Sequence, residues 1–412
     1  MPTGDADWLA LTPEPTLEPE LPICDAHHHL WEFRPEPVPY QRYLLAELAE
    51  DLGSGHNVRA TVFIEVKARY RPDGPEDMRP VGEVEFVEGL ATESARGRYG
   101  RTRMAAAIIG YADLKLGERV TPVLDAMQAA SPTRFRGVRH SVGWDASPDL
   151  VKRESQGVLS SEQYRAGARV LARRGLCLEN SLYHPQLEEL AAFARAVPDL
   201  TIVLNHIGGL VRIGAYANRD GEVLPAWRLG IAAVAACPNV ILKLGGVGQR
   251  RFGFDWHTRA KPIGSAELAA ALAPLMHYCI EQFGPRRCMF ESNFPWTRCP
   301  TPTTSCTTPS SGCPRATHPP SGRPCSTTPP ARVYRLTSSD QKGTRQRKSH
   351  GHDGAPARAG DLGRLTERGR VTCSSIPPPR QSSGGSPVGR AQGGGADRNR
   401  WLPGGRRRRT RG

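Results

Sequence analysis

The stretch TIVLNHIGG (residues 201–209) joins a short apolar run directly to two polar residues, Asn205 and His206, and then to two glycines. The chain holds seven other runs of similar apolar character, and most of them also end on polar residues. They span residues 22–27, 60–66, 104–114, 135–140, 176–181, 240–246 and 287–295. Near-continuous apolar runs are typical of parallel strands that are buried on both faces.

Amphipathic segments with helical periodicity separate these runs. Examples are GEVEFVEGLATESA (82–95), EQYRAGARVLARR (162–174) and SAELAAALAPLMHYCIEQF (265–283). Eight strands that alternate with helices in one domain predict an α/β fold, a (β/α)8 barrel. An open doubly wound sheet is the alternative, but it would require a glycine-rich phosphate turn after an early strand, and the sequence has none.

The charge is unevenly distributed along the 412 residues, whose formal net charge is +14. Residues 1–295 contain 33 Lys+Arg and 36 Asp+Glu, a net charge of −3, and residues 296–412 contain 22 and 5, a net charge of +17. The C-terminal part is also too poor in large apolar residues to offset the entropy of folding. We therefore expect an N-terminal extension (1–20), a barrel (21–295), a short intermediate segment (296–336) and a disordered basic tail (337–412).

Neither the N-terminus nor the cysteines indicate export. The first residues lack a basic region followed by an apolar stretch, and no segment is long and apolar enough to span a bilayer. The five cysteines of the barrel region are scattered without a CxxC pair, which fits reduced thiols. We expect a cytoplasmic protein.

Polar residues stand at the ends of most predicted strands, where a (β/α)8 barrel carries its chemistry. They are His27, His29, Glu65, Arg139, His140, Glu179, Asn180, Asn205, His206 and Lys243. In CDAHHHLWEF (24–33), His27 and His29 lie on the same side of a strand and can bind one metal ion together. A histidine triplet can also be an exposed loop, and His206 can be a core histidine that a neighbour satisfies.

The motifs resemble the amidohydrolase-2 family of metal-dependent hydrolases, in its sugar-lactone and dicarboxylate-lactone branch. The resemblance rests on CDAHHHLWEF (24–33), FRGVRHSVGWDASP (135–148), the stretch 183–209, NVILKLGG (239–246) and RCMFESNFP (287–295). The resemblance implies a TIM barrel that binds a divalent metal ion, with zinc as the first candidate. Some lactonase members of the family work without a metal ion. The family's metal ligands correspond to His27, His29 and His184, and its strand-six histidine corresponds to His206.

The family pattern predicts an Asp shortly after SNFP, but this chain has Trp296 and Thr297 there. Reading the codons one base earlier turns the junction of these two residues into an Asp codon. The same frame gives a plausible amphipathic helix over the following residues, and ARVYRL (331–336) then resembles the family's C-terminal ending in the normal frame. We interpret residues 296 to about 330 as a compensated frameshift that replaces the last barrel helix and the catalytic Asp. A genuine divergent extension is the alternative.

The resemblance implies a hydrolase that opens a small polar lactone by metal-assisted attack of water. His206 is the expected proton donor or oxyanion partner, and Arg139 is expected to hold a substrate carboxylate, unless it forms a salt bridge instead. Glu65, Lys243 and His140 are further candidates for substrate binding. Two alternatives remain open, namely a metal-dependent decarboxylase of the same superfamily and an inactive barrel whose basic tail binds nucleic acid without specificity.

Overall fold

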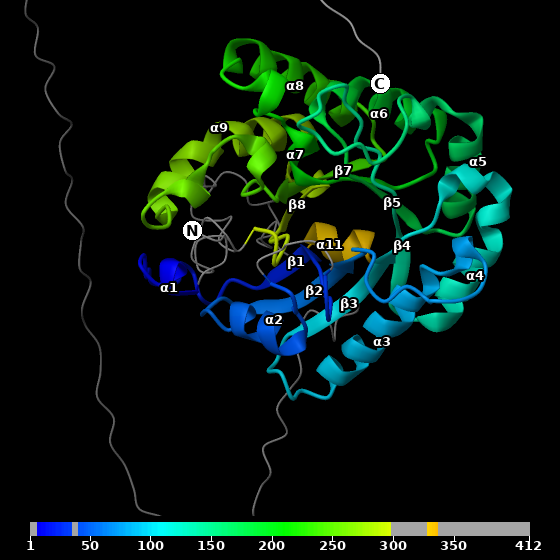
Figure 1. Cartoon of the computed structure of the whole chain (residues 1–412), viewed down its shortest axis with the longest axis horizontal. Coiled ribbons are helices and arrows are strands. Elements are labelled where there is room, and N and C mark those ends of the chain that lie inside the picture. The colour runs from blue at the N-terminus through cyan, green and yellow to red at the C-terminus, as the bar shows by residue number, and fades with distance from the viewer. Residues whose placement is uncertain (1–5, 35–39, 298–327, 337–412) are drawn as a thin grey trace, which may run out of the picture. The chain divides into compact units, whose positions relative to one another are not determined.

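The computed structural model describes residues 6–34, 40–297 and 328–336, and it confirms the predicted α/β barrel (Figure 1). Eight parallel strands form one sheet in the order β1 to β8, so each strand lies beside its neighbour in sequence. The strands are β1 (Ile23–His28), β2 (Val58–Ile64), β3 (Arg103–Gly110), β4 (Phe135–Arg139), β5 (Cys177–Asn180), β6 (Ile202–Leu204), β7 (Val240–Gly245) and β8 (Cys288–Glu291). Each lies within or overlaps one of the eight apolar runs.

Helices cover the outside of the strands. They are α1 (Ala6–Leu9), α2 (Leu45–Leu52), α3 (Val81–Ala95), α4 (Thr121–Ala130), α5 (Glu162–Arg173), α6 (Leu187–Ala196), α8 (Asp220–Ala235) and α9 (Ser265–Phe283). The amphipathic pattern located α3, α5 and α9 to within one residue at either end. Their apolar faces pack on the outer faces of the strands and form one continuous core.

The barrel is closed between β1 and β8 by backbone and side-chain hydrogen bonds. The Asn293 N–H donates to His27 O at 2.8 Å, and the His29 N–H donates to Phe294 O at 2.8 Å. The buried Asp25 carboxylate accepts the Ser292 N–H at 2.8 Å and the Ser292 hydroxyl at 2.6 Å. These bonds fix the end of the last strand against the first, which carries the HxH pair.

The run TIVLNHIGG does not remain extended to its end. Strand β6 stops at Leu204, and residues His206–Gly209 form a short turn, α7. His206 and Ile207 have positive φ values of 52° and 45°, a conformation that non-glycine residues adopt at a cost of about 1–3 kcal/mol. Gly209 is required in this turn, because a Cβ there would lie 1.8 Å from Leu182 O. The turn directs His206 into the barrel mouth.

The C-terminal segment α11 (Thr328–Val333) and the residues that follow it close the opposite end of the barrel. Tyr334 is fully buried and lies with Leu336 among small and branched side chains of the strands, including Ala26, Ala60 and Val62. Arg136 near the start of β4 donates to Tyr334 O at 2.7 Å, and Arg332 donates to Arg286 O before β8 at 2.8 Å. Residues near the end of the described chain are therefore part of the barrel interior.

A buried glutamate in the first turn of α3 organises the loop after β2. One oxygen of Glu83 accepts the N–H groups of Val66 at 2.9 Å and Ala68 at 2.7 Å, and the other oxygen has no hydrogen-bond partner in the part of the chain that is described. Burial raises the pKa of Glu83 to about 8, and the nearby Glu65 adds to the rise. The folded protein therefore holds a proton on Glu83 at neutral pH.

We predict a pH-dependent contribution of Glu83 to stability. The pKa of Glu83 is about 8 in the folded state and roughly 4.3 in the unfolded state. Between pH 4.3 and pH 8, roughly, the folded protein therefore binds a proton at Glu83 that the unfolded chain does not bind. The free energy of unfolding falls as the pH rises through this range. The Glu83→Gln variant should show a smaller decrease in unfolding free energy over this pH range. Urea unfolding at several pH values between 5 and 8 measures it, with the exposed Glu85→Gln on the same helix as control. An unchanged pH slope in Glu83→Gln would contradict the prediction.

Some expectations fall outside the described residues. The frameshift interpretation of the segment up to about residue 330 rests mainly on residues 298–327, and the basic tail covers 337–412, so both stay predictions. In the part of the chain that is described, the barrel's five cysteines are buried and form no disulfide, and no helix has the length and apolar character required to cross a membrane.

Candidate functional site

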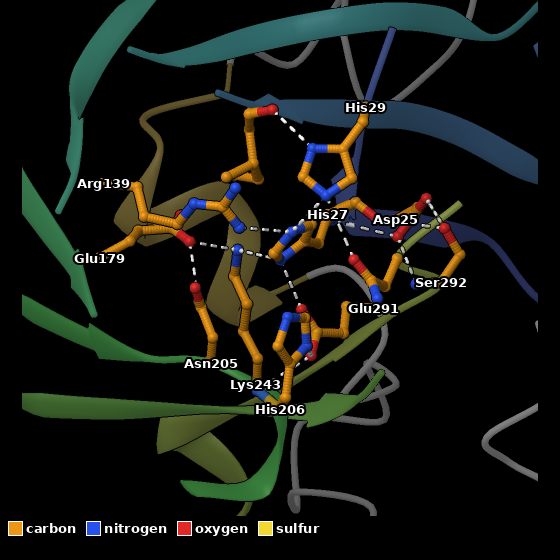
Figure 2. Close-up of polar contacts among 12 residues, drawn as sticks. Asp25, His27, His29, Arg139, Glu179, Asn205, His206, Lys243, Glu291 and Ser292 are labelled. Carbon is orange, nitrogen blue, oxygen red and sulfur yellow. Dashed lines mark hydrogen bonds and ion pairs between the residues drawn. The ribbon is translucent and has the colours of Figure 1, made fainter. Parts of the chain in front are cut away.

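Polar side chains from most of the strands, and from the residues that directly follow them, converge inside the barrel at the carboxyl ends of the strands (Figure 2). Those nearest the centre are His27 and His29 of the first strand end, His206 of α7 and Glu291 at the end of β8. All four are buried, with relative exposures of 0–6%. His28, between the two clustered histidines, points to Thr61 instead, whose hydroxyl lies 2.8 Å from His28 Nε2.

The histidines contact one another directly. His27 Nε2 lies 3.2 Å from His29 Nε2, and the ring centroids of His27 and His206 are 4.8 Å apart. His27, His206 and Glu291 each offer a ligand atom within 4.8 Å of the others. The structure thus brings together both members of the predicted HxH pair and the predicted strand-six histidine.

Two of the three histidines have a defined hydrogen-bonding pattern. His29 Nδ1 lies 2.8 Å from Ile64 O, and because a carbonyl oxygen only accepts, this nitrogen carries the proton. His206 Nδ1 lies 2.6 Å from Glu291 Oε1 and donates to that carboxylate. Neutral rings with a protonated Nδ1 carry a lone pair on Nε2, the form in which histidine binds metals.

Burial keeps the cluster uncharged. It lowers the pKa of His27, His29 and His206 well below the usual value, and nearby cations add to the effect. The principal cation is Lys243 for His27, Arg139 for His29 and Arg251 for His206. The three rings are therefore neutral at physiological pH.

Glu291 is the carboxylate of the cluster. Its Oε1 accepts both the ring and the backbone N–H of His206, at 2.6 and 3.1 Å, while Oε2 lies 2.7 Å from His27 Nδ1 without hydrogen-bond geometry. Burial raises the pKa of Glu291 to about 7, and Lys243 opposes this rise. The group can take up or release a proton near neutral pH.

Arg139 forms a buried ion pair with Glu65. Its Nε donates to Glu65 Oε1 at 2.7 Å, its Nη2 donates to Glu65 O, and its Nη1 lies 3.2 Å from His27 Nε2. The salt-bridge alternative raised for Arg139 is thus present, although the pair lies inside the site. Arg139 borders the histidines, and Glu65 holds it there.

Lys243 belongs to a buried polar network that runs through the barrel. Its Nζ lies 2.7 Å from Glu179 Oε2 and 3.4 Å from His27 Nδ1. The other oxygen of Glu179 accepts the Tyr334 hydroxyl at 2.7 Å, and Asn205 donates to Oε2 at 2.8 Å. The C-terminal segment therefore contacts the same glutamate that fixes Lys243 beside His27.

Two predicted site residues have their described contacts elsewhere. His184, at the start of the short helical turn His184–Gln186, accepts the Val211 N–H on Nδ1 at 3.3 Å and packs edge-on against Tyr216. His140 accepts the Leu114 N–H and pairs with Glu154 at 3.1 Å. The structure does not join either residue to the histidine cluster, and their predicted roles in metal and substrate binding stay predictions.

The position of the predicted missing Asp also lies away from the cluster contacts. Trp296 packs against Trp31, with ring centroids 5.4 Å apart, and Thr297 donates its hydroxyl to Ser292 O. The residue beyond β8 that does contact the cluster is Asn293, whose Oδ1 lies 3.2 Å from His29 Nε2. The end of β8 thus supplies a carboxylate in Glu291 and an amide in Asn293.

Sequence reasoning did not select Glu291, Asn293 or the Asp25–Ser292 pair. The rule that found the other residues, a polar side chain at the end of an apolar run, also applies to Glu291 in RCMFESNFP. The family pattern, however, predicts the carboxylate of strand eight further along the chain, after SNFP. Asp25 precedes the HxH pair within the strand, and no sequence signal indicated its partner Ser292, 267 residues away.

The residues present fit a divalent cation. Three neutral imidazoles and one carboxylate form a donor set that suits zinc. The two neighbouring cations do not prevent this, because Arg139 is paired with Glu65 and Lys243 with Glu179. Glu291 then remains as the negative charge in contact with the histidines.

The chain is similar in sequence and in fold to several known proteins. A sequence model of the family Amidohydro_2, described as amidohydrolase, matches residues 24–304. An uncharacterized protein, y4mH, of Sinorhizobium fredii is 29% identical over 67% of this chain and 86% of its own length. An L-fucono-1,5-lactonase of Burkholderia multivorans is 25% identical over 66% of this chain and 81% of its own length. A crystal structure of an amidohydrolase from the same species with bound zinc has a TM-score of 0.59 at 21% identity, over 76% of this chain and 99% of that one.

A (β/α)8 barrel with a cluster of polar side chains at the carboxyl ends of its strands has the arrangement of a barrel enzyme. Because the family model covers more than half of the sequence, the chain belongs to the amidohydrolase family Amidohydro_2. This membership confirms the family resemblance that the motifs indicated.

Proposed function

We propose that this protein hydrolyses a small polar lactone with the help of a divalent metal ion, for which zinc is the first candidate. The observation that carries the proposal is that His27, His206 and Glu291 each offer a ligand atom within 4.8 Å of the others, with His29 Nε2 3.2 Å from His27 Nε2. The similarity to L-fucono-1,5-lactonase over most of that enzyme's length supports a lactone as the substrate.

The three histidines would hold the metal. When bound, a divalent cation polarises the lactone carbonyl and lowers the pKa of a coordinated water. Glu291 Oε1 keeps His206 in the tautomer whose Nε2 is free. Lys243, fixed by Glu179, and Arg139, fixed by Glu65, flank His27 with N–H groups that can stabilise the oxygen on which negative charge develops.

Glu291 is the residue that we assign to proton transfer. Among the described residues its Oε2 has no hydrogen-bond partner, and a pKa of about 7 suits a group that must accept and release a proton at neutral pH. As the water oxygen bonds to the carbonyl carbon, its proton passes to Oε2. When the bond between that carbon and the ring oxygen breaks, the proton passes on to the ring oxygen, and the product is a hydroxy acid.

The test is a screen of γ- and δ-lactones, including sugar lactones, with the purified full chain and added zinc. We expect acid release that a chelator abolishes and that zinc restores. His27→Ala should lack this activity, while His257→Ala, at a half-buried position outside the cluster, should retain it. Release of CO2 from hydroxybenzoic acids, without ring opening of any lactone, would overturn the proposal in favour of a decarboxylase.

A further inference from the structure

We infer that Tyr334 is a positioning residue of the histidine site. Its hydroxyl fixes the carboxylate of Glu179, and through this carboxylate it holds Lys243 beside His27. The inference rests on the proposed function and deepens it, because it makes hydrolysis depend on a segment near the end of the described chain. That segment lies beyond residues 24–304, which the family model matches.

The hydroxyl of Tyr334 reaches the site from the closed end of the barrel. Figure 1 shows α11, which directly precedes Tyr334, inside the ring of strands. The Tyr334 side chain is fully buried, and its hydroxyl donates to Glu179 Oε1 at 2.7 Å. Burial raises the pKa of Tyr334 well above its usual value, and the charge of Glu179 adds to the rise. The hydroxyl therefore keeps its proton and acts as the donor.

The carboxylate of Glu179 is held by three donors. Its Oε2 accepts the Asn205 side-chain N–H at 2.8 Å and the Lys243 ammonium at 2.7 Å. Among the described residues, Tyr334 is the one partner of Oε1. Without this hydroxyl, Oε1 would be a buried acceptor that lacks a donor, and such an atom gains free energy by turning toward another donor. The Lys243 ammonium already contacts the carboxylate, so the two oxygens would compete for it.

Lys243 also contacts the ring of Tyr334 directly. Its Nζ lies 5.7 Å from the ring centroid, within the range of a cation–π interaction. The same Nζ lies 3.4 Å from His27 Nδ1. A shift of the ammonium therefore changes the surroundings of His27 and moves the N–H groups that we assigned to stabilising the developing negative charge. A displacement of about 1 Å can lower a reaction rate about 100-fold.

The backbone of the C-terminal segment keeps Tyr334 in this position. Arg136 Nε donates to the Tyr334 carbonyl oxygen at 2.7 Å, and the Tyr334 N–H donates to Pro330 O at 2.9 Å. Leu336, two residues further along, belongs to the same buried cluster inside the barrel. A side chain that is fixed on both sides along the chain has little freedom to move. Its hydroxyl can therefore set the orientation of Glu179 rather than follow it.

The experiment compares Tyr334→Phe with Tyr43→Phe as the matched control. The Tyr43 hydroxyl also donates to a buried carboxylate, that of Asp51 in α2, at 2.5 Å. We expect Tyr334→Phe to lower kcat for the best lactone of the screen about 10- to 100-fold, with KM within about threefold of wild type, because Lys243 acts on the developing charge. Tyr43→Phe should keep the wild-type kcat at a temperature at which circular dichroism shows both variants folded. A wild-type kcat in Tyr334→Phe, or an equal loss in Tyr43→Phe, would overturn the inference.

Nuclear magnetic resonance of the full chain with isotope-labelled histidine, without added metal, separates this inference from the lactonase proposal. We expect Tyr334→Phe to shift the ring nitrogen signals of His27, because Lys243 moves beside its Nδ1, and to leave those of the half-buried His257 unchanged. Tyr43→Phe should leave both sets of signals unchanged. That result would support the positioning role even if no lactone were opened. Unchanged His27 signals in Tyr334→Phe would overturn the inference.

Arg136→Met provides the test if Tyr334→Phe does not fold. This variant removes the donor to the Tyr334 carbonyl oxygen and leaves the tyrosine hydroxyl in place. We expect it to shift the His27 ring signals in a folded protein, because the segment that carries Tyr334 is then less firmly held. His27 signals that match wild type in this variant would count against the positioning role.

Discussion

Replacing Glu291 by Gln is expected to abolish most of the activity, lowering kcat about 10²- to 10⁴-fold. The amide cannot accept the proton that we assign to Oε2. It also presents an N–H₂ group to one of the two rings that face the carboxylate, His27 at 2.7 Å or His206 at 2.6 Å. A ring that must accept at Nδ1 becomes protonated at Nε2, and this tautomer cannot bind a metal there.

Two measurements check this prediction. Steady-state hydrolysis of the best lactone from the screen gives the loss in kcat, and zinc titration should show affinity that is weaker by about 10- to 100-fold. Glu281→Gln, an exposed acid at the end of α9, is the control and should retain full activity. A Glu291→Gln variant that keeps more than about a tenth of the wild-type kcat with unchanged zinc affinity would show that Glu291 plays neither role.

Replacing Lys243 by Met is expected to destabilise the fold by about 3–5 kcal/mol. Lys243 and Glu179 are both fully buried, with Nζ 2.7 Å from Oε2, so removal of the lysine leaves a carboxylate without its charge partner inside the barrel. Glu179→Gln alone should be destabilising for the same reason, since it leaves the ammonium of Lys243 unpaired. Chemical unfolding followed by circular dichroism measures both effects.

The double variant Lys243→Met/Glu179→Gln distinguishes a lost charge pair from lost packing. We expect it to recover most of the stability, because neither charge then remains buried. The Tyr334 hydroxyl can still donate to the glutamine oxygen. Asn205 Oδ1, which has no hydrogen-bond partner within the described residues, can turn to accept from the glutamine amide. Arg173→Met, which breaks an exposed pair with Glu118, should cost less than about 1 kcal/mol. Additive losses in the double variant would contradict this explanation.

Much of the fold could be predicted from the sequence because its signals are local. An apolar run between polar residues indicates a buried parallel strand wherever it occurs, and eight of them in alternation with helices admit few topologies. The end of the run TIVLNHIGG, in contrast, depends on a contact between distant residues. The strand stops at Leu204 because the turn that follows is set by the close approach of Gly209 to Leu182 O, a contact that no local pattern contains.

The candidate site was predictable to the extent that its residues occupy strand ends. His27, His29, Glu65, Arg139, His206 and Lys243 were all selected in this way. Their partners were not, because pairing depends on which side chains meet across the barrel. The structure shows that Arg139 is held by Glu65 and Lys243 by Glu179, whereas Glu291, not a later Asp, contacts the histidines.

The sequence by itself therefore determined the barrel, its family resemblance and the HxH pair, since period, composition and motif spacing are properties of neighbouring residues. Only the tertiary structure decided that Tyr334 closes the barrel against Glu179 and that the same glutamate fixes Lys243. Both facts depend on what surrounds a buried polar atom, and those surroundings come from segments that lie up to 155 residues apart in the chain. Burial then sets the charge of each group, because the cost of an unpaired charge arises only when water is excluded.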